Sequence, residues 1–412
     1  MKTFNFAKRM ENIRASEIRE LLKITENPEI ISFAGGLPAP ELFPTEELAA
    51  ISVKVLLEEG QKALQYSTTE GYIPLRKKIA GRMNRIFKTS VSSDEILITN
   101  GSQQALDMIG KAFIDEGDAI FCESPSYMGA LNAFRAYGPK FVEVPTDSQG
   151  MLPEELDRAL SANPCKKLIY VIPDFQNPTG RTWSVERREA LAVLAEKHKV
   201  IVVEDNPYGE LSFDGKIQPS VKSMDKNGKV IYLGTFSKTF CPGMRIGWAA
   251  AEARIIEKLA LVKQGADLHT STISQIQLNR YLEEYNLDER ILKLREVYKL
   301  RRDTIVEAME KYFPSYAKFN RPGGGLFTWA ELPECINSRA LLKRSLITGV
   351  AFVPGGSFFP CIPKENTMRI NYSNMPEERI VEGIRRLGSC IEEMYNSHNS
   401  TPTEINKHGY QV

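Results

Sequence analysis

The sequence reads Val230-Ile-Tyr-Leu-Gly-Thr-Phe-Ser-Lys238, followed by Pro242-Gly-Met-Arg245-Ile-Gly247. The apolar start predicts a buried strand, which ends in two hydroxyl residues, Thr235 and Ser237, and a single lysine. A lysine at a strand end can form a Schiff base when its surroundings suppress its positive charge. The hydroxyls and Arg245 offer donors and a fixed cation, which together suit a phosphate group. An ordinary strand followed by a surface lysine would give the same local pattern, so other residues must decide between the two interpretations.

The composition excludes several classes of protein. The 412 residues include 53 basic and 52 acidic side chains, and this balance gives no electrostatic support for a nucleic-acid partner or an anionic membrane surface. No apolar run reaches the length of a membrane span, and the first residues lack the apolar block of a signal peptide. The six cysteines are scattered, without a CxxC pair or nearby histidines, so we expect neither a disulfide framework nor a metal site. These features predict a cytoplasmic protein with reduced cysteines.

Between about residues 92 and 250, short apolar stretches alternate with amphipathic ones. Nearly all-apolar strands separated by helices predict an α/β fold, in which a mostly parallel seven-stranded sheet lies between helices. Ligands bind such sheets beyond the carboxyl ends of the strands. The expected strands are Ile96–Thr99, Ala119–Cys122, Lys140–Val144, Leu168–Ile172, Val200–Glu204, Val230–Leu233 and Ile246–Ala250. The expected helices are Gln103–Ile114, Glu154–Leu160 and Val185–His198.

The C-terminal part has a different pattern. Residues 254–310 predict long helices with breaks near Gly265 and Asn286, and the remainder alternates strands with helices. We expect a large domain over residues 45–290, a smaller α+β domain formed by residues 1–44 and 291–412, and a frayed tail over residues 397–412. The expected strands of the smaller domain are Leu326–Glu331, Val350–Val353 and Met368–Tyr372, and its expected helices are Ser338–Ile347 and Glu377–Tyr395.

Two further strand ends could bind a phosphate and a flat ring. Asn100-Gly-Ser-Gln-Gln104 follows a strand and opens a helix, where free backbone amides and Ser102 could donate to a phosphate. A plain N-cap serine would give the same pattern. Ser124-Pro-Ser-Tyr-Met128 ends another strand, and its Tyr127 could stack on a planar ring or serve as a core tyrosine at a turn.

An amide and a carboxylate follow at the next two strand ends. Asn177, in Asp174-Phe-Gln-Asn-Pro-Thr-Gly180, could donate to a ring hydroxyl, although Asn-Pro and Thr-Gly also mark an ordinary tight turn. Asp205, in Val203-Glu-Asp-Asn-Pro-Tyr208, is costly to bury without a cation, and a protonated ring nitrogen would be a suitable partner. Tyr208 could reach the same ring. Single aspartates at strand ends are commonly loop caps, so each of these signals is weak alone.

Taken together, these residues occur in order, each at a strand end of one predicted sheet. Because these residues occur in this order, the sequence resembles the fold-type I pyridoxal-phosphate-dependent aminotransferases of class I/II, and the resemblance covers nearly its whole length. The resemblance implies an aspartate aminotransferase-like fold and pyridoxal 5'-phosphate as the cofactor. It is closest to the 2-aminoadipate/kynurenine aminotransferase branch, through Ser32-Phe-Ala-Gly-Gly-Leu-Pro38, Gln65-Tyr-Ser-Thr-Thr-Glu-Gly-Tyr72, Asn100-Gly-Ser-Gln-Gln-Ala-Leu106, Gln264-Gly-Ala-Asp-Leu-His269 and Val353-Pro-Gly-Gly356.

The resemblance also implies a role for each polar residue of the predicted site. Lys238 would hold the cofactor as a Schiff base, Asp205 would pair with its ring nitrogen, and Tyr127 would stack on its ring. Asn177 and Tyr208 would contact the ring hydroxyl. Catalysis would depend on Lys238, Asp205 and Tyr208. The phosphate would be bound by Ser102, Gln103, Thr235, Ser237 and Arg245.

The same resemblance implies a homodimer with shared active sites, because Tyr66 would reach the cofactor phosphate of the neighbouring subunit. Arg369 would bind the α-carboxylate of the substrate in a bidentate geometry that a lysine cannot reproduce. Gly36 and Asn177 would also contact the substrate. Arg19 matches an arginine that reads the substrate side-chain carboxylate, and a solvated helix arginine paired with a neighbouring glutamate is the alternative.

The activity implied is amino transfer between an L-amino acid and a 2-oxo acid by a ping-pong mechanism. The expected donors are 2-aminoadipate, glutamate, leucine, aromatic amino acids and kynurenine, with 2-oxoglutarate as the acceptor. Cofactor-binding residues would equally serve a lyase or a decarboxylase of the same fold, but Arg369 and the stretch Phe33–Pro38 favour amino transfer. The effector-binding module of a transcription regulator is a further alternative, although no basic recognition helix precedes the segment that begins near residue 10.

Overall fold

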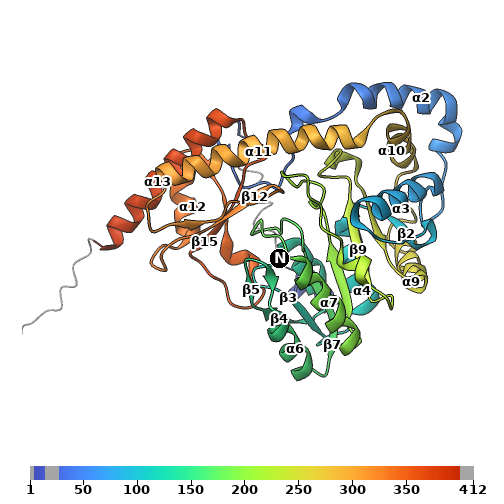
Figure 1. The fold of residues 1–412 in the computed structure, drawn as a ribbon, viewed down its shortest axis with the longest axis horizontal. Coiled ribbons are helices and arrows are strands. Elements are labelled where there is room, and N and C mark those ends of the chain that lie inside the picture. Colours follow the sequence, from blue (N-terminus) through green and yellow to red (C-terminus); the bar gives the residue numbers. More distant parts are fainter. Residues whose placement is uncertain (1–3, 14–26, 400–412) are drawn as a thin grey trace, which may run out of the picture.

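The computed structural model describes residues 4–13 and 27–399 of the chain. Its largest sheet consists of β2 (Ile96–Asn100), β3 (Ala119–Glu123), β4 (Lys140–Val144), β7 (Lys166–Val171), β8 (Ile201–Asp205), β9 (Val230–Thr235) and β10 (Ile246–Ala250). The strand order is β2-β10-β9-β8-β7-β3-β4 (Figure 1). Only β10 runs antiparallel to its neighbours, so the other strands of this sheet share one direction. The predicted α/β fold with a mostly parallel seven-stranded sheet is confirmed.

Helices cover this sheet on both faces (Figure 1). They are α2 (Thr45–Ala63), α3 (Ile73–Phe87), α4 (Ser102–Phe113), α5 (Met128–Arg135), α6 (Pro153–Ala162), α7 (Val185–His198), α8 (Val221–Met224), α9 (Ala253–Gln264) and α10 (Thr272–Glu284). Ile169 and Val202 belong to a core shared with α6 and α7, whereas the next residues, Tyr170 and Val203, belong to one shared with α4 and α9. This division arises because successive side chains of a strand point to opposite faces of the sheet.

A smaller antiparallel sheet forms in the C-terminal part, with the order β11-β12-β15-β14. Its strands are β11 (Lys318–Phe319), β12 (Phe327–Glu331), β14 (Val353–Pro354) and β15 (Thr367–Asn371). The same part of the chain contains the helices α12 (Ser338–Ile347) and α13 (Glu377–Asn399). The N-terminal segment joins this part, because β1 (Ile31–Ser32) pairs in parallel with β13 (Val350–Ala351). The prediction of one strand over Val350–Val353 is wrong, because the chain leaves β1 at Phe352 and pairs with β15 from Val353 onward.

The long helix α11 (Leu287–Tyr312) connects the two sheets and lies beside α13 at its C-terminal end (Figure 1). The predicted helix break at Asn286 is confirmed, since its side chain caps α11 by accepting hydrogen bonds from the amides of Asp288 and Glu289. The predicted break near Gly265 is confirmed as well, because α9 ends at Gln264. The expected domain boundary between residues 290 and 291 falls inside α11, and the division into two domains stays a prediction.

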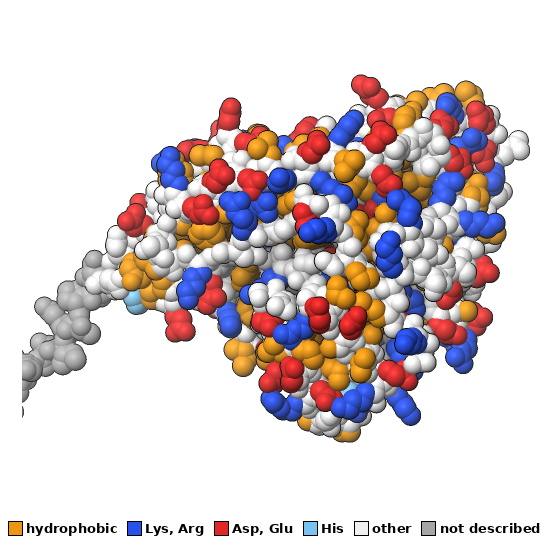
Figure 2. Space-filling model, in the orientation of Figure 1, with side chains coloured by type: hydrophobic (Ala, Val, Ile, Leu, Met, Phe, Trp, Pro, Cys, Tyr) orange, Lys and Arg blue, Asp and Glu red, His pale blue; other side chains and the backbone are white. Residues whose placement is uncertain are grey.

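The remaining elements are short. A hairpin joins β5 (Thr146–Asp147) to β6 (Gly150–Met151), and 3₁₀ helices lie at Lys8–Glu11, Pro40–Leu42, Ser93–Glu95, Pro242–Met244 and Gly355–Phe358. A frayed tail was expected over residues 397–412. α13 continues to Asn399, where the Ser397 hydroxyl donates to the Glu393 carbonyl at 2.7 Å, and residues 400–412 lie outside the described residues. Among the described residues, no helix combines the length and the apolar character that a membrane span requires. Basic and acidic side chains are interspersed over the face of the molecule in Figure 2.

Candidate active site

A cavity of about 250 Å³ lies where the polar strand ends of the large sheet meet the N-terminal segment and β15. Every predicted site residue that the structure describes lines it, with the exception of Tyr66. Its walls consist of Gly36, Ser102, Gln103, Tyr127, Ile172, Asn177, Asp205, Pro207, Tyr208, Thr235, Ser237, Lys238, Pro242, Arg245 and Arg369. The structure therefore brings together side chains that are far apart in the sequence.

The predicted phosphate donors are connected by hydrogen bonds. The Thr235 hydroxyl donates to the Ser237 hydroxyl at 2.9 Å, and Arg245 Nη1 donates to the same Ser237 oxygen at 3.4 Å. Arg245 Nη2 donates to the Asn100 carbonyl at 3.2 Å, next to the start of α4 at Ser102. The first amides of a helix have no partner within the helix and attract anions. Hydroxyls, a guanidinium and helix amides thus converge on one end of the cavity, as a bound phosphate requires.

Arg245 reaches this place because β10 is antiparallel. The amino end of β10 lies at the same sheet edge as the carboxyl ends of the other strands, and Arg245 directly precedes it with a left-handed φ of 54°. Gly247 then passes close to the start of α4, since a Cβ atom on it would lie 2.6 Å from the backbone nitrogen of Ser102. Only glycine allows so close an approach between β10 and the phosphate-binding end.

Asp205 is buried at the end of β8 with only one of its two oxygens satisfied. Its Oδ2 accepts a hydrogen bond from the Tyr170 hydroxyl at 2.9 Å, whereas Oδ1 is buried and has no partner. Burial raises the pKa of the Asp205 carboxyl to about 7, although the Tyr170 hydrogen bond lowers it. A buried carboxylate oxygen without a hydrogen-bond donor costs free energy. Oδ1 can therefore accept a hydrogen bond from a positively charged donor on a ligand.

Lys238 lies between the phosphate-binding end and Arg369. Its Nζ donates to the Gly36 carbonyl at 2.7 Å. Burial, followed by the positive charges of Arg369 and Arg245, lowers the pKa of Lys238 to about 8. An amine with this pKa is uncharged in roughly one molecule in ten at pH 7, far more often than an ordinary lysine, and the uncharged amine is the nucleophile and the base.

Arg369 is an almost fully buried cation on β15. Its Nη1 donates to Asn177 Oδ1 at 2.9 Å and its Nη2 to the Ala34 carbonyl at 2.5 Å, whereas its Nε is buried without a partner. The guanidinium carbon lies 4.3 Å and 5.2 Å from the ring centroids of Phe327 and Phe358. Burial lowers the pKa of Arg369 to about 10. No carboxylate pairs with this guanidinium among the described residues, so it can bind an external one.

Two aromatic side chains complete the cavity. The Tyr127 hydroxyl donates to Gln103 Oε1 at 3.3 Å, which ties the tyrosine to the first turn of α4. Tyr208 packs edge-on against Phe327, with ring centroids 5.9 Å apart. Burial raises the pKa of Tyr127 to about 12 and that of Tyr208 further. Both phenols therefore remain protonated at neutral pH and can donate to a ligand.

One predicted residue in the described part of the chain, Tyr66, is not part of this cavity. Tyr66 is 78% exposed, and its nearest aromatic contact is His269, at 5.8 Å between ring centroids. Within the one subunit described, Tyr66 does not line the site. Arg19 lies outside the described residues, so its predicted role stays a prediction.

The sequence interpretation missed several residues that shape the cavity. Tyr170 could have been found from strand register, because it pairs with Val203, two residues before Asp205, and so faces the same side of the sheet. Pro207 lies inside the stretch that was already singled out around Asp205. Phe327 and Phe358, which enclose Arg369, gave no signal beyond ordinary core hydrophobicity.

Comparison with known proteins identifies the family. The sequence profile described as aminotransferase class I and II matches residues 36–387. Aromatic-amino-acid aminotransferase 1 of Thermococcus litoralis is 47% identical over 392 residues, covering 94% of each chain. The 2-aminoadipate transaminase of Thermus thermophilus is 44% identical over 390 residues, covering 94% of this chain and 96% of its own.

A solved structure gives the same answer and indicates the cofactor. LysN, the α-aminoadipate aminotransferase of Thermus thermophilus, was solved in complex with N-(5'-phosphopyridoxyl)-L-leucine. It superposes with a TM-score of 0.89 at 42% identity, covering 95% of this chain and 98% of its own. The cofactor is therefore pyridoxal 5'-phosphate, as expected from the resemblance. The chain belongs to the family of class I and II aminotransferases.

Proposed function

We propose that this aminotransferase has broad specificity and transfers amino groups from 2-aminoadipate, glutamate, leucine, aromatic amino acids or kynurenine to a 2-oxo acid, such as 2-oxoglutarate for donors other than glutamate. The observation that carries the proposal is the Arg369 guanidinium, which has no carboxylate partner among the described residues and lies in the same cavity as Lys238 and Asp205. An α-carboxylate shared by all these donors is its natural partner. The names of the two relatives, one aromatic and one 2-aminoadipate aminotransferase, support breadth in the side chain.

The described residues fit the cofactor. Asp205 Oδ1, buried without a partner, would accept from the protonated ring nitrogen. Asn177 and Tyr208 would hold the ring hydroxyl, and Tyr127 would stack on the ring. The phosphate would be held by Ser102, Gln103, Thr235, Ser237 and Arg245. When bound, the cofactor supplies an electron sink for the charge left on the substrate carbon.

The protein side chains perform the remaining tasks. Arg369 binds the α-carboxylate and so orients the substrate, while Asn177 keeps the guanidinium in place through their 2.9 Å hydrogen bond. Lys238, once its amine is free, moves the proton at the substrate Cα, and its low pKa suits that task near neutral pH. Asp205 maintains a negative charge opposite the ring nitrogen.

An activity assay of the purified protein with a panel of amino donors and oxo-acid acceptors tests the proposal. We expect each proposed donor to give its 2-oxo acid beyond one equivalent per active site only when an acceptor oxo acid is present: 2-oxoglutarate for most donors, and a different oxo acid for glutamate. Release of carbon dioxide or of an elimination product without an acceptor would instead identify a decarboxylase or a lyase. In the same panel, Arg19→Ala should weaken activity on 2-aminoadipate and glutamate but not on leucine, and the reverse pattern would refute the proposed role of Arg19.

Arg369→Lys is expected to raise the KM for amino donors about 100-fold, or roughly 2.7 kcal/mol, because a lysine cannot replace the two-point contact with the α-carboxylate. Steady-state kinetics with leucine and glutamate measure this change. A simple primary amine, which lacks the α-carboxylate, provides the control and should react equally slowly with both proteins. An equal loss with donor and amine would mean that Arg369 acts only on the structure of the site.

We also propose a homodimer in which Tyr66 contacts the cofactor phosphate of the neighbouring subunit. The proposal is supported by apolar side chains left in solvent near Tyr66, such as Leu57 on α2 and Leu64, which are 82% and 72% exposed. A single exposed apolar residue is ordinary, but Val53, Leu56 and Ile73 of the same stretch of chain are exposed as well, and such a group favours an interface.

Sedimentation equilibrium tests the dimer, with an expected mass twice the 46.4 kDa of one chain. Tyr66→Phe is expected to weaken cofactor binding about tenfold, because it removes one hydrogen bond to a charged phosphate. Tyr395→Phe, far from the cavity on α13, is the control and should bind the cofactor normally. A monomeric mass, or unchanged cofactor affinity in the Tyr66 variant, would contradict the shared site.

We further propose that the protein works in the cytoplasm. All six cysteines are free, and Cys165, Cys335 and Cys361 are exposed. Exposed thiols of this kind are typical of a reducing compartment. Recovery of the protein in the membrane or extracellular fraction of its source cells would contradict the proposal.

A further inference from the structure

A second cavity, of about 680 Å³, lies between the loops that follow the central strands and the segment that precedes β12. One wall contains the turn after β7, with Phe175 and Arg181, and the loop after β8. The other wall contains Arg302 of α11 and residues 320–323. Hydrogen bonds join the two walls, because the Phe213 amide donates to the Gly323 carbonyl at 2.9 Å and Asn320 Nδ2 donates to the Thr179 carbonyl at 2.7 Å.

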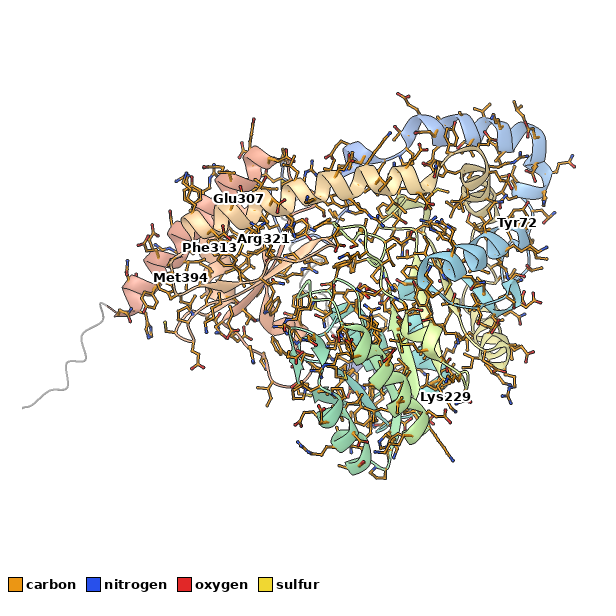
Figure 3. All side chains as sticks on the ribbon, viewed as in Figure 1. Tyr72, Lys229, Glu307, Phe313, Arg321 and Met394 are labelled. Carbon is orange, nitrogen blue, oxygen red and sulfur yellow. The ribbon has the colours of Figure 1, made fainter. Side chains whose placement is uncertain are left out.

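Cationic side chains dominate this cavity: Arg181, Lys216, Lys299, Arg302 and Arg321. Figure 3 labels Arg321, which lies close to α11 on the part of the molecule that carries the smaller sheet. Of the two acids in the walls, Asp174 is already neutralised by the buried Arg188 at 2.6 Å. The other, Asp214, accepts hydrogen bonds from the Ser212 hydroxyl at 2.7 Å and the Lys216 amide at 2.9 Å.

Part of this positive charge has no internal partner. Asp303 on α11 pairs with both Arg302 and Arg321, at 2.9 Å each, and so compensates only one of these two charges. Among the described residues, Lys216 and Lys299 form no ion pair, and both are exposed at the rim of the cavity. The chain as a whole is almost neutral, with 53 basic and 52 acidic residues, so a local excess of cations is not a consequence of composition.

We propose that this second cavity binds a small anion with at least two negative charges, of the phosphate or dicarboxylate type. Arginine guanidinium groups and lysine ammonium groups lie on opposite walls, so such an anion can contact both walls at once. Phe175 and Phe213 would cover a short carbon skeleton between the charged groups. The phosphate end of the active site is a different place, since no residue lines both cavities.

The two cavities share a structural element, the turn after β7. Asp174, Phe175, Gly180 and Arg181 of this turn line the second cavity, whereas Asn177 between them lines the active site and accepts from Arg369. An anion that bridges Arg181 and Lys299 restrains the turn relative to α11, and with it Asn177. Occupancy of the second cavity is therefore expected to change the KM for amino donors. This effect on KM rests on the proposed function, whereas anion binding itself does not.

Calorimetric titration of the cofactor-loaded protein tests the proposal, with inorganic phosphate in one arm and succinate in the other, at low ionic strength. Loading with pyridoxal phosphate fills the phosphate end of the active site. Because Arg369 of the active site can also bind a carboxylate of succinate, only the part of the binding that the lysine variants below weaken is assigned to the second cavity. We expect saturable binding that is about tenfold weaker in Lys216→Gln/Lys299→Gln, because two charge-assisted contacts are lost. Phosphate binding alone would identify a phosphate-bearing ligand, and succinate binding alone a dicarboxylate.

The matched control is Lys140→Gln/Lys343→Gln, which removes the same charge from two exposed lysines that line neither cavity. It should bind both anions as the unmodified protein does. Absence of saturable binding, or equal weakening in the two double variants, would overturn the site. A KM that stays constant while phosphate saturates the protein would overturn the coupling through Asn177, and the donor panel would still test amino transfer separately.

Discussion

Lys238→Ala is expected to lower the turnover of amino transfer by about 10⁴-fold, the largest effect of any single substitution in this chain. Among the described residues, Lys238 is the only lysine that lines the active-site cavity, so no other amine can form the Schiff base or move the proton at the substrate Cα. Its pKa, lowered to about 8 by burial and by two neighbouring arginines, makes it the suitable base. The rate of 2-oxo acid formation from leucine and 2-oxoglutarate measures the loss.

Two controls separate chemistry from structure in this experiment. Lys238→Arg keeps the positive charge but not the nucleophile, and we expect it to be as inactive as the alanine variant. Both variants retain Thr235, Ser237 and Arg245, so both should still bind pyridoxal phosphate. Because no Schiff base holds the cofactor in either variant, denaturation should release it without hydrolysis of a covalent bond. Amino transfer by either variant at a rate near that of the unmodified protein would refute the role of Lys238.

The fold could be predicted well wherever apolar periodicity was strong. The strands of the central sheet were found because buried parallel strands are short continuous apolar runs, and α7 was found with its bounds correct at Val185–His198. The region around Val350–Val353 was misjudged because pairing partners are not encoded locally. Val350 and Ala351 pair with the N-terminal segment, Val353 pairs with β15, and Phe352 lies between the two strands.

The site was predictable to the extent that the chemistry of its residues is visible in the sequence. Polar residues at strand ends meet in space because parallel strands end at one edge of a sheet. That rule alone predicts that Asp205, Asn177 and Lys238 lie close together. The rule cannot reveal contacts made by residues that look like ordinary core. Tyr170 is an example, since its hydroxyl holds Asp205 Oδ2 at 2.9 Å and leaves Oδ1 free. The role proposed for Tyr66 involves a second subunit, which a single chain does not contain.

Asp205→Asn is expected to lower turnover by about 10²- to 10³-fold, because an amide cannot supply the negative charge that keeps the ring nitrogen protonated. The volume and the hydrogen bond from Tyr170 can be retained, so the fold should tolerate the change. Turnover in the donor panel and the absorbance of the bound cofactor measure the effect. Burial alone raises the pKa of this carboxyl to about 7, so the proposed ring-nitrogen cation opposite Oδ1 would keep it ionised at neutral pH.

The neighbouring residue provides a matched control, since burial also raises the pKa of Glu204 to about 7. Titration therefore does not distinguish the two carboxyls, but geometry does. Glu204 points to the opposite face of β8, where its oxygens accept from the amides of Val221 and Lys222 at 2.9 and 2.8 Å. Glu204→Gln should cost about 1–3 kcal/mol of stability, measured by urea unfolding, and leave turnover within a few-fold. If both variants lost turnover equally, the effect of Asp205 would be structural, and its pairing with the ring nitrogen would be wrong.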